Sequence, residues 1–365
     1  MSRQNRLIRF AVIATATIGS IWAQGTFTGL GQHDTYVSGI SGDGTTIVGV
    51  FSNIGPAFRW TAAGGVVNIG GAGPLAAISR DGNTIVTDAK DAQGVTSAAI
   101  WQGGTTWKTL GGLPNGVVSD GARSNVGAVS GDGSVVVGLA WVPKALAHAF
   151  RWDGQNGMVD LGILQTNSSR ANAVSVDGNL VAGWDAAPGG GGSLGPYDYW
   201  RGVIWWQGLE RLINPFGFIG QVRTINNDGS VIVGRGSPSA PRHAYRYTAW
   251  DGVVTDLGAL KRGTLPSTQV NEDTSIALAA SDDGTVVIGR SGWRPPLDAF
   301  IYTDATGIVK LSDYLTSKGV AIPNGWVLLE AYAITPDGKT IAGTGTDPAG
   351  FVEGWVATLP IVTLY

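Results

Sequence analysis

The sequence predicts an all-β fold, a seven-bladed β-propeller of four-stranded blades whose ring is closed by the N-terminal strand. Three observations predict it: a glycine-rich and aromatic composition, a motif that occurs seven times, and an extra strand before the first repeat that matches a strand missing from the last. The 365 residues include 57 Gly and 14 Trp, and only 14% of them are charged. Disordered chains are poor in aromatic residues and rich in charge, whereas this composition is typical of short strands joined by tight turns.

The repeated motif is a small or polar residue, any residue, and then Asp-Gly. Its aspartates are Asp43, Asp81, Asp132, Asp177, Asp228, Asp283 and Asp337. The first and the last are 294 residues apart, so the mean spacing is 49 residues. A glycine stands six residues after each aspartate, except in the second copy, which has Thr87. Asp-Gly between apolar runs predicts a hairpin, here with the positive φ angles of a type I′ turn.

Each unit carries two more apolar segments, typified by Ala149-Phe150-Arg151-Trp152 and by Met158-Val159-Asp160-Leu161-Gly162. Four strands in a unit of 40 to 50 residues is the period of a propeller blade. The last unit ends at Trp355-Val356-Ala357 without a fourth strand, and Phe27-Thr28-Gly29-Leu30-Gly31 is a fourth strand with no unit before it. We therefore expect the N-terminal strand to complete the seventh blade. An open β-solenoid is the competing architecture.

Residues 1–23 have the pattern of a secretory signal peptide, and residues 24–365 are expected to form one propeller domain. Three arginines and no acid precede an apolar stretch of 14 residues, Phe10 to Ala23. That stretch is short for a membrane anchor, and no later segment is apolar for long enough to span a bilayer. The sequence thus predicts export, to the medium, the cell surface or the periplasm.

Charge and cysteine content exclude several classes of site. Removing residues 1–23 changes the net charge from −3 to −6, which argues against a nucleic-acid partner. Without cysteine the chain has no disulfide, thiolate metal site or cysteine nucleophile. The seven aspartates lack the neighbouring acids of a calcium loop, and three histidines without metal-ligand spacing do not suggest zinc. We expect no metal, no cofactor and a monomeric protein.

The amino-acid sequence of the repeats resembles the HAF-type extracellular repeat family, named for a His-Ala-Phe tripeptide. Here the tripeptide stands as His148-Ala149-Phe150, with the variant His243-Ala244-Tyr245, and the Ser-x-Asp-Gly-x-x-Val-Val-Gly stretch is also similar to that family. The resemblance covers nearly all of residues 26–358. It implies an exported bacterial repeat protein, often joined to a surface anchor, with no catalytic residues to transfer.

One set of candidate site residues lies where the first strand of each blade begins, near the propeller axis. The residues at this position are Tyr36, Pro74, Asn125, Arg170, Gln221, Ile276 and Glu330. Of the four glutamates, Glu210, Glu272, Glu330 and Glu353, only Glu330 stands there. Tyr36, Arg170 and Glu330 at one mouth suggest a sugar site, although solubility also favours polar residues around a channel.

A second set consists of aromatic residues in the variable loops, on the face opposite the Asp-Gly turns. These are Trp141, Trp184, Trp293, Tyr197, Tyr199 and Trp200. Exposed Trp and Tyr suit sugar rings or protein contacts, while the alternative is that they pack the loops down.

We therefore expect an exported non-catalytic binding, adhesion or display module. Its ligand, a glycan or a cell-surface protein, would lie on the variable-loop face. The alternative is a carbohydrate-active hydrolase or lyase with Glu330 and Arg170 at the central mouth. A third possibility is a structural ring that only displays another module.

Overall fold

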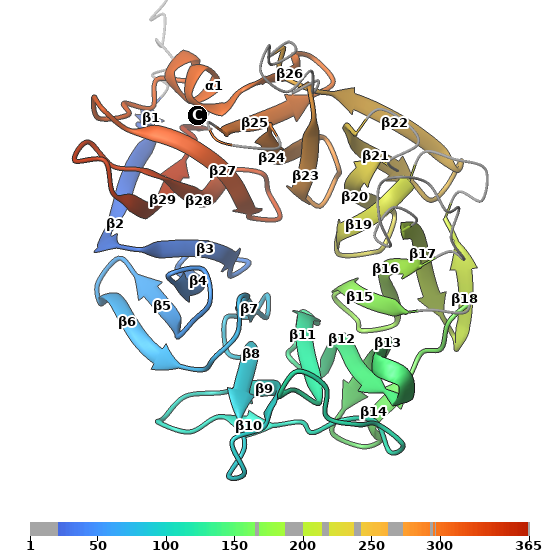
Figure 1. Cartoon of the computed structure of the whole chain (residues 1–365). Coiled ribbons are helices and arrows are strands. Elements are labelled where there is room, and N and C mark those ends of the chain that lie inside the picture. Colours follow the sequence, from blue (N-terminus) through green and yellow to red (C-terminus); the bar gives the residue numbers. More distant parts are fainter. Residues whose placement is uncertain are drawn as a thin grey trace, which may run out of the picture.

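The predicted seven-bladed propeller is confirmed by the computed structural model, which describes residues 21–164, 168–186, 200–213, 219–236, 242–261, 273–292, 295 and 297–363. Seven antiparallel sheets of four strands stand around a central axis (Figure 1).

The first four blades follow the chain in order. Blade 1 contains β3 (Thr35–Ile40), β4 (Thr46–Phe51), β5 (Ala57–Thr61) and β6 (Gly65–Gly70). Blade 2 contains β7 (Ala77–Ile78), β8 (Ile85–Lys90), β9 (Thr96–Trp101) and β10 (Lys108–Thr109). Blade 3 contains β11 (Ser124–Val129), β12 (Val135–Val142), the 3₁₀ turn η1 (Pro143–Ala145), β13 (Leu146–Asp153) and β14 (Gly157–Asp160). Blade 4 contains β15 (Ser169–Val174), β16 (Leu180–Ala186), β17 (Trp200–Trp206) and β18 (Leu209–Leu212).

The remaining blades lead back to the start of the ring. Blade 5 contains β19 (Ile219–Ile225), β20 (Val231–Gly236), β21 (Ala244–Thr248) and β22 (Val253–Gly258). Blade 6 contains β23 (Ser275–Ala280), β24 (Val286–Ser291), β25 (Asp298–Thr303) and β26 (Gly307–Lys310). Blade 7 contains β27 (Val327–Ile334), β28 (Thr340–Thr346), β29 (Val352–Thr358) and the N-terminal strand β2 (Thr26–His33).

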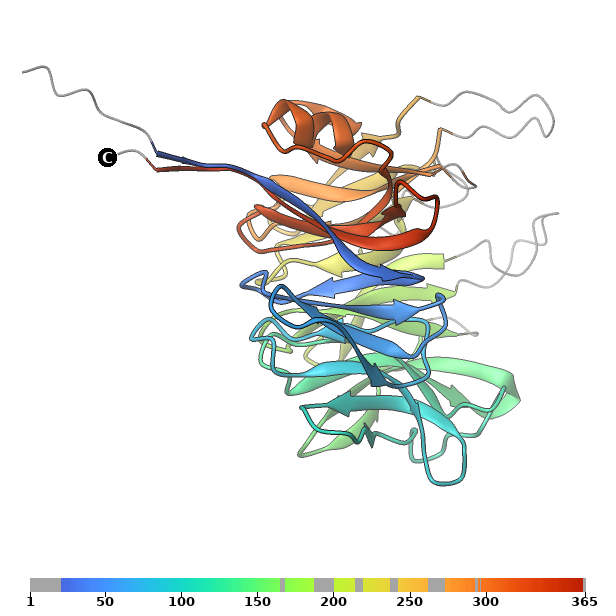
Figure 2. The ribbon, with the colours of Figure 1, turned by 90° about the vertical axis from the view of Figure 1, so that its left-hand side faces the viewer.

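The ring closes as predicted, through strand β2. It pairs antiparallel with β29, from Thr26 opposite Thr358 to Gly29 opposite Trp355. Beyond the ring, β1 (Ile21–Ala23) and β30 (Ile361–Thr363) pair as a two-stranded ribbon that leaves the face of the Asp-Gly turns (Figure 2). Residues 1–20 of the predicted signal peptide lie outside the described residues, so its cleavage stays a prediction.

The core lies between neighbouring blades rather than in one central mass. One cluster, for example, joins Val137 and Ala149 of blade 3 to Ala171 and Val181 of blade 4. Packing sheet on sheet around a circle in this way buries both faces of each blade. The described chain contains no helix that is long and apolar enough to cross a membrane.

The Asp-Gly turns differ from the type I′ geometry expected from the sequence. The glycines have φ between +66° and +77° in all seven turns, but none of the aspartates has a positive φ. In blade 1, Ser41 Oγ donates to the Asp43 carboxylate, which accepts the backbone N–H of Thr45. These bonds, the one from Ser41 first, lower the pKa of Asp43 below its usual 3.8. The aspartate therefore organises the turn with its side chain, which an Asx-type turn allows without left-handed backbone.

The glycine six residues after each aspartate is required by a close approach within the blade. A Cβ on Gly138 would lie 2.1 Å from the carbonyl oxygen of Asn125 in the first strand. At the other five glycines, a Cβ would lie 1.8 to 2.0 Å from the corresponding carbonyl oxygen of their own blade. The exception, Thr87, is accommodated because β7 is only two residues long, and Thr87 Oγ1 donates to Leu75 O at 2.6 Å. A truncated first strand thus explains the one departure from the repeat.

Helix α1 (Leu311–Ser317) is a second difference from the sequence prediction, which ended a strand at Leu311-Ser312. Leu311 and Leu315 are both buried and lie one helical turn apart, so this segment buries one face as a helix. The helix ends before Gly319, whose φ is +80°.

Candidate ligand site in the central channel

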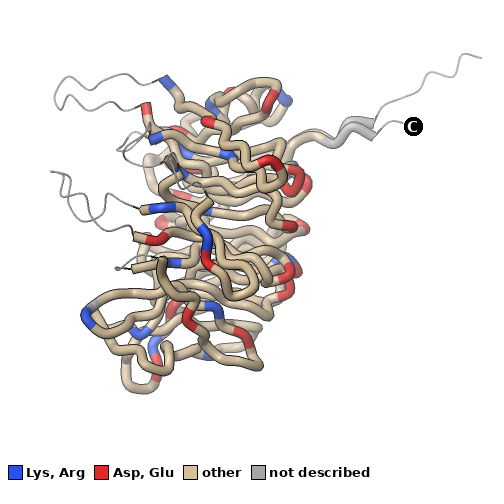
Figure 3. Tube along the Cα trace, turned by 90° about the vertical axis from the view of Figure 1, so that its right-hand side faces the viewer, with Lys and Arg blue, Asp and Glu red and all other residues tan. Residues whose placement is uncertain are grey.

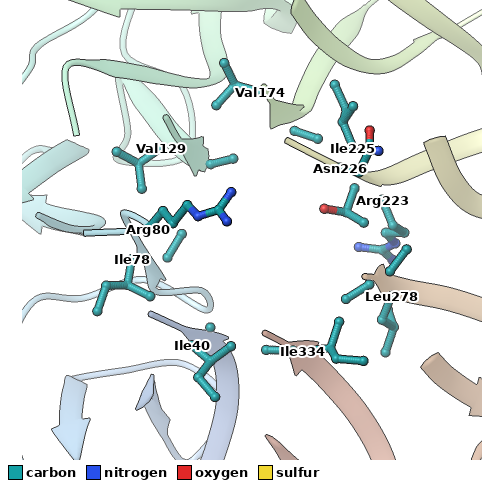
Figure 4. Close-up of a pocket in the computed structure, with 18 of the residues that line it drawn as sticks. Ile40, Ile78, Arg80, Val129, Val174, Arg223, Ile225, Asn226, Leu278 and Ile334 are labelled. Carbon is teal, nitrogen blue, oxygen red and sulfur yellow. The ribbon is translucent and has the colours of Figure 1, made fainter. Parts of the chain in front are cut away.

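The first strands of all seven blades line a channel along the propeller axis. One cavity of this channel has a volume of about 280 Å³ and extends from the Asp-Gly turns to Arg170, Arg223 and Tyr332. One layer of its lining is apolar and consists of Ile40, Ile78, Val129, Val174, Ile225, Ala280 and Ile334 (Figure 4). A ring of aliphatic side chains therefore surrounds the channel next to the Asp-Gly turns.

An ion pair crosses the channel at the face of the Asp-Gly turns. Arg80 Nη2 of blade 2 lies 3.1 Å from Asp282 Oδ2 of blade 6, and these blades are not neighbours in the ring. Figure 4 shows Arg80 extending into the channel. Asp282 also accepts a hydrogen bond from Asn227, and its backbone oxygen accepts one from Asn226 at 2.7 Å. This network narrows one mouth, so the open approach is from the opposite, loop-bearing face.

Six of the first strands contain a β-bulge at a residue that lines the channel. These residues are Ser38, Gly127, Asn172, Arg223, Leu278 and Tyr332, and all of them line the cavity. A bulge inserts an extra residue and re-aims its side chain, and here it places Arg223 and Tyr332 beside the axis. Neither Arg223 nor Tyr332 was predicted from the sequence to lie in the site.

The second strands of blades 2, 5 and 6 add charged groups to the loop-bearing half of the channel. Asp88, Arg235 and Arg290 each follow the position of the repeated glycine. Asp88 is 1% exposed and accepts hydrogen bonds from Asn125 Nδ2 at 2.8 Å and Val126 N at 2.7 Å. Burial raises the pKa of Asp88 in spite of these bonds and of the nearby Arg170. Arg290 donates to Glu330, so each acid already has a protein partner.

Two arginines in the channel, Arg170 and Arg223, form no ion pair with a carboxylate among the described residues. The Nε atoms of Arg170 and Arg223 are buried and have no hydrogen-bond partner among the described residues. Arg170 Nη2 makes one long bond, 3.4 Å, to Val126 O. Burial, followed by repulsion from Arg223, lowers the pKa of Arg170; burial likewise lowers that of Arg223, with Arg290 adding to the effect. Arg235 is also desolvated, and burial together with the surrounding arginines lowers its pKa to about 10.

The structure brings the first set of predicted residues to the same channel. Tyr36 and Glu330 line a cavity of about 320 Å³ at the loop-bearing mouth, together with Arg223, Arg290 and Tyr332. Arg170 lies deeper and lines the adjoining cavity. Tyr36, Arg170 and Glu330 thus line the channel, whereas Asn125, Gln221 and Ile276 at the same repeat position line neither cavity.

The loop aromatic residues that the structure describes, Trp141, Trp184 and Trp200, do not line this site. Trp184 and Trp200 stack on each other with ring centroids 4.9 Å apart, and Trp141 has a buried indole nitrogen. Among the described residues that line the two cavities, none is a tryptophan. Trp293, Tyr197 and Tyr199 lie outside the described residues.

Charge is distributed unequally between the two faces. Among the residues that the structure describes, Asp and Glu gather towards the face of the Asp-Gly turns, whereas Lys and Arg gather towards the opposite face (Figure 3). The open mouth of the channel therefore lies on the more basic face, although the chain as a whole is acidic.

Comparison with known proteins gives the fold but no family. The sequence matches no protein-family model and no curated protein. Among solved structures, the β-propeller domain of the Trilobed protease from Pyrococcus furiosus is similar, with a TM-score of 0.55 and 11% identity over 88% of this chain and 93% of that one. An oligogalacturonate lyase in complex with manganese is similar with a TM-score of 0.53 and 14% identity, over 94% of this chain and 98% of the lyase. The oligogalacturonate lyase from Vibrio parahaemolyticus has a TM-score of 0.54 and 12% identity, over 93% of this chain and 97% of the lyase. At these identities the similarity shows a shared propeller fold.

The histidines lie away from the channel, and each pairs with an aspartate. His148 Nδ1 lies 2.8 Å from Asp160 Oδ2, and His243 makes the equivalent contact with Asp256 at 3.0 Å. Both pairs join the third strand of a blade to its fourth, which gives the histidine of the repeat a structural role.

His33 belongs to the one described group of three residues whose ligand atoms lie within 4.8 Å of one another, with Asp347 and Glu353. His33 Nε2 lies 3.1 Å from Asp347 Oδ2, and Glu353 accepts the Gly31 N–H at 2.7 Å. The three side chains link β2 to blade 7, so protein contacts account for their proximity.

The pKa of the Glu210 carboxyl group is strongly raised, but this residue lies on an outer strand, away from the channel. It lies on β18, the outer strand of blade 4, beside the fully buried Asp185. Burial, and then the charge of Asp185, raises the pKa of Glu210 to about 8. Between pH 4.5 and about 8 the folded protein therefore keeps a proton that the unfolded chain releases, so the free energy of unfolding falls as the pH rises through this range.

Glu210→Gln is expected to remove that decline. The variant should match the native protein at pH 5 and exceed it in stability at pH 9, as measured by urea midpoints. Asp313→Asn, at an exposed position of α1, is the control. A native protein whose midpoint does not fall between these pH values would contradict the assignment.

Proposed function

We propose that this chain is an exported, non-catalytic binding propeller whose ligand lies at the loop-bearing mouth of the central channel. The observation that carries the proposal is the convergence of Tyr36, Glu330 and Tyr332 on one cavity of about 320 Å³. Polar groups from separate blades that meet in a pocket of this size are the usual form of a small-molecule site. The resemblance to HAF-type repeats and the predicted signal peptide support export.

Binding without turnover is favoured by the state of the acids. A hydrolase or lyase needs a carboxyl group that can exchange a proton with its substrate. Glu330 is occupied by its ion pair with Arg290, and Asp88 by Asn125 and Val126. The acid whose pKa is raised to about 8, Glu210, lies on an outer strand. A carbohydrate-active enzyme with Glu330 at the mouth is the second candidate, since Glu330 does line the cavity.

A glycan-array screen with product detection tests both candidates. The native chain is compared with Tyr36→Phe and Glu330→Gln at the mouth, and with Trp141→Ala, whose indole does not line either cavity. We expect bound glycans to be lost from the mouth variants and kept by Trp141→Ala, with no new reducing ends or unsaturated products. Turnover by the native chain that Glu330→Gln abolishes would favour the enzyme. Absence of binding to any glycan would remove both carbohydrate functions and leave a protein-binding or display role.

A further inference from the structure

Among the described residues, the loop-bearing half of the channel holds more positive than negative charge. Four arginines, Arg170, Arg223, Arg235 and Arg290, lie there with two acids, Asp88 and Glu330, in the part of the chain that the structure describes. The two acids hydrogen-bond to groups other than Arg170 and Arg223. Neither Arg170 nor Arg223 has a carboxylate within ion-pair distance in the described part of the chain.

Two neighbouring guanidinium groups in this state are costly to the folded protein. A buried cation loses its hydration, and its repulsion from a second cation adds to that cost unless an anion or hydrogen-bond acceptors compensate. Both pKa values are lowered, mainly by burial, which is the direction expected for cations in an unfavourable environment. An arrangement that costs stability and is not needed to pack the blades is typical of a binding site.

We propose that the polar half of the channel binds an anionic ligand, whose oxyanion group, a carboxylate or a phosphate, lies between the guanidinium groups of Arg170 and Arg223. This inference rests on the proposed function and names the class of its ligand. Guanidinium groups bind carboxylate and phosphate through pairs of charge-assisted hydrogen bonds. Tyr332, which interacts electrostatically with both arginines, supplies a hydroxyl beside them.

The rest of the channel determines how such a ligand enters. The Arg80–Asp282 pair narrows the mouth at the Asp-Gly turns, and along β19 the apolar Ile225 stands between Arg223 and the turn. The anionic group would therefore enter first from the opposite, more basic face and reach the two arginines before the apolar layer (Figure 3). The uncharged part of the ligand then lies beside Tyr36 and Glu330 at the mouth.

The test compares galacturonate with galactose, which has the same ring hydroxyls and lacks the carboxylate. Melting temperature and calorimetric Kd are measured at physiological ionic strength, with sodium chloride to match the added salt. We expect galacturonate to raise the melting temperature and galactose to leave it unchanged. Inorganic phosphate forms a separate arm: a rise with phosphate that equals the rise with galacturonate assigns the site to the oxyanion alone, and a larger rise with galacturonate assigns it to an acidic sugar.

Arg223→Met identifies the binding group. Because the substitution removes a buried charge without a partner, the ligand-free variant should melt at the same temperature as the native chain or higher. Its affinity for galacturonate should fall roughly tenfold or more, the usual effect of losing a hydrogen bond to a charged group. Arg170→Gln is the second variant and should also lose affinity. Arg80→Met, which removes the same charge at the opposite mouth, should keep it.

The inference is overturned if galacturonate and phosphate act no more strongly than sodium chloride, if Arg223→Met binds galacturonate normally, or if Arg223→Met melts well below the native chain. A neutral glycan bound at the mouth with Arg223 irrelevant would leave the proposed function standing without this inference. If an anion binds in a way that depends on Arg223 but no glycan of the array binds at the mouth, the inference stands and the proposed glycan binding does not.

Discussion

Replacing Gly138 by Ala is expected to lower the free energy of unfolding by about 3 kcal/mol or more. The new Cβ would lie 2.1 Å from Asn125 O, 2.9 Å from a ring carbon of Phe150 and 3.0 Å from Gly127 N. Two of these three atoms belong to the backbone of the first strand, which has no space to retreat because the next blade packs against it. Urea unfolding followed by tryptophan fluorescence measures the change.

Gly154→Ala in the same blade is the matched control. Nothing lies within 4 Å of a Cβ at that position, which is exposed in the turn between β13 and β14. The control should be within about 0.5 kcal/mol of the native chain. Equal midpoints for Gly138→Ala and the native chain would show that the strands are not as close as described.

A chain that begins at Asp34, and so lacks β2, is expected to lose most of its stability. Phe27 stacks on Trp355 with ring centroids 5.9 Å apart, and Leu30 is 4% exposed. Losing the partly buried Phe27, the buried Leu30 and the pairing of β2 with β29 costs on the order of 5–10 kcal/mol, which is comparable with the whole stability of a typical domain. The truncation also leaves β29 as an unpaired edge, so aggregation is expected.

The control is a chain that begins at Gln24 and keeps β2. It should unfold at the native urea midpoint, whereas the chain beginning at Asp34 should be unfolded or aggregated without urea. Addition of a peptide spanning residues 24–33 should partly restore the native fluorescence. A truncated chain with the native midpoint would show that β2 does not close the ring.

The architecture was predictable because each blade repeats the same local chemistry. Seven Asp-Gly turns gave the number of blades, and the unpaired Phe27 to Gly31 segment gave the closure. The turn geometry was predicted wrongly, because the sequence does not show that the Asp43 side chain replaces left-handed backbone. Helix α1 was missed because Leu311 stands at the position where the fourth strands of other blades end.

The candidate site was predictable only in part. The repeat alignment placed Tyr36, Arg170 and Glu330 at the axis. It missed Arg223 and Tyr332, because a β-bulge is a backbone irregularity without a sequence signature and it re-aims these residues towards the channel. Arg290 and Asp88 were missed for another reason: they follow the repeated glycine position, a place where the other blades carry apolar and aromatic as well as polar residues.

A crystal structure of the native chain with galacturonate tests the central claim most directly, because it locates the ligand. The account predicts the sugar in the loop-bearing half of the channel, with its carboxylate between Arg170 and Arg223 and its hydroxyls towards Tyr36 and Glu330. Galacturonate bound instead on the rim against Trp184 and Trp200, or only outside the channel, would contradict it.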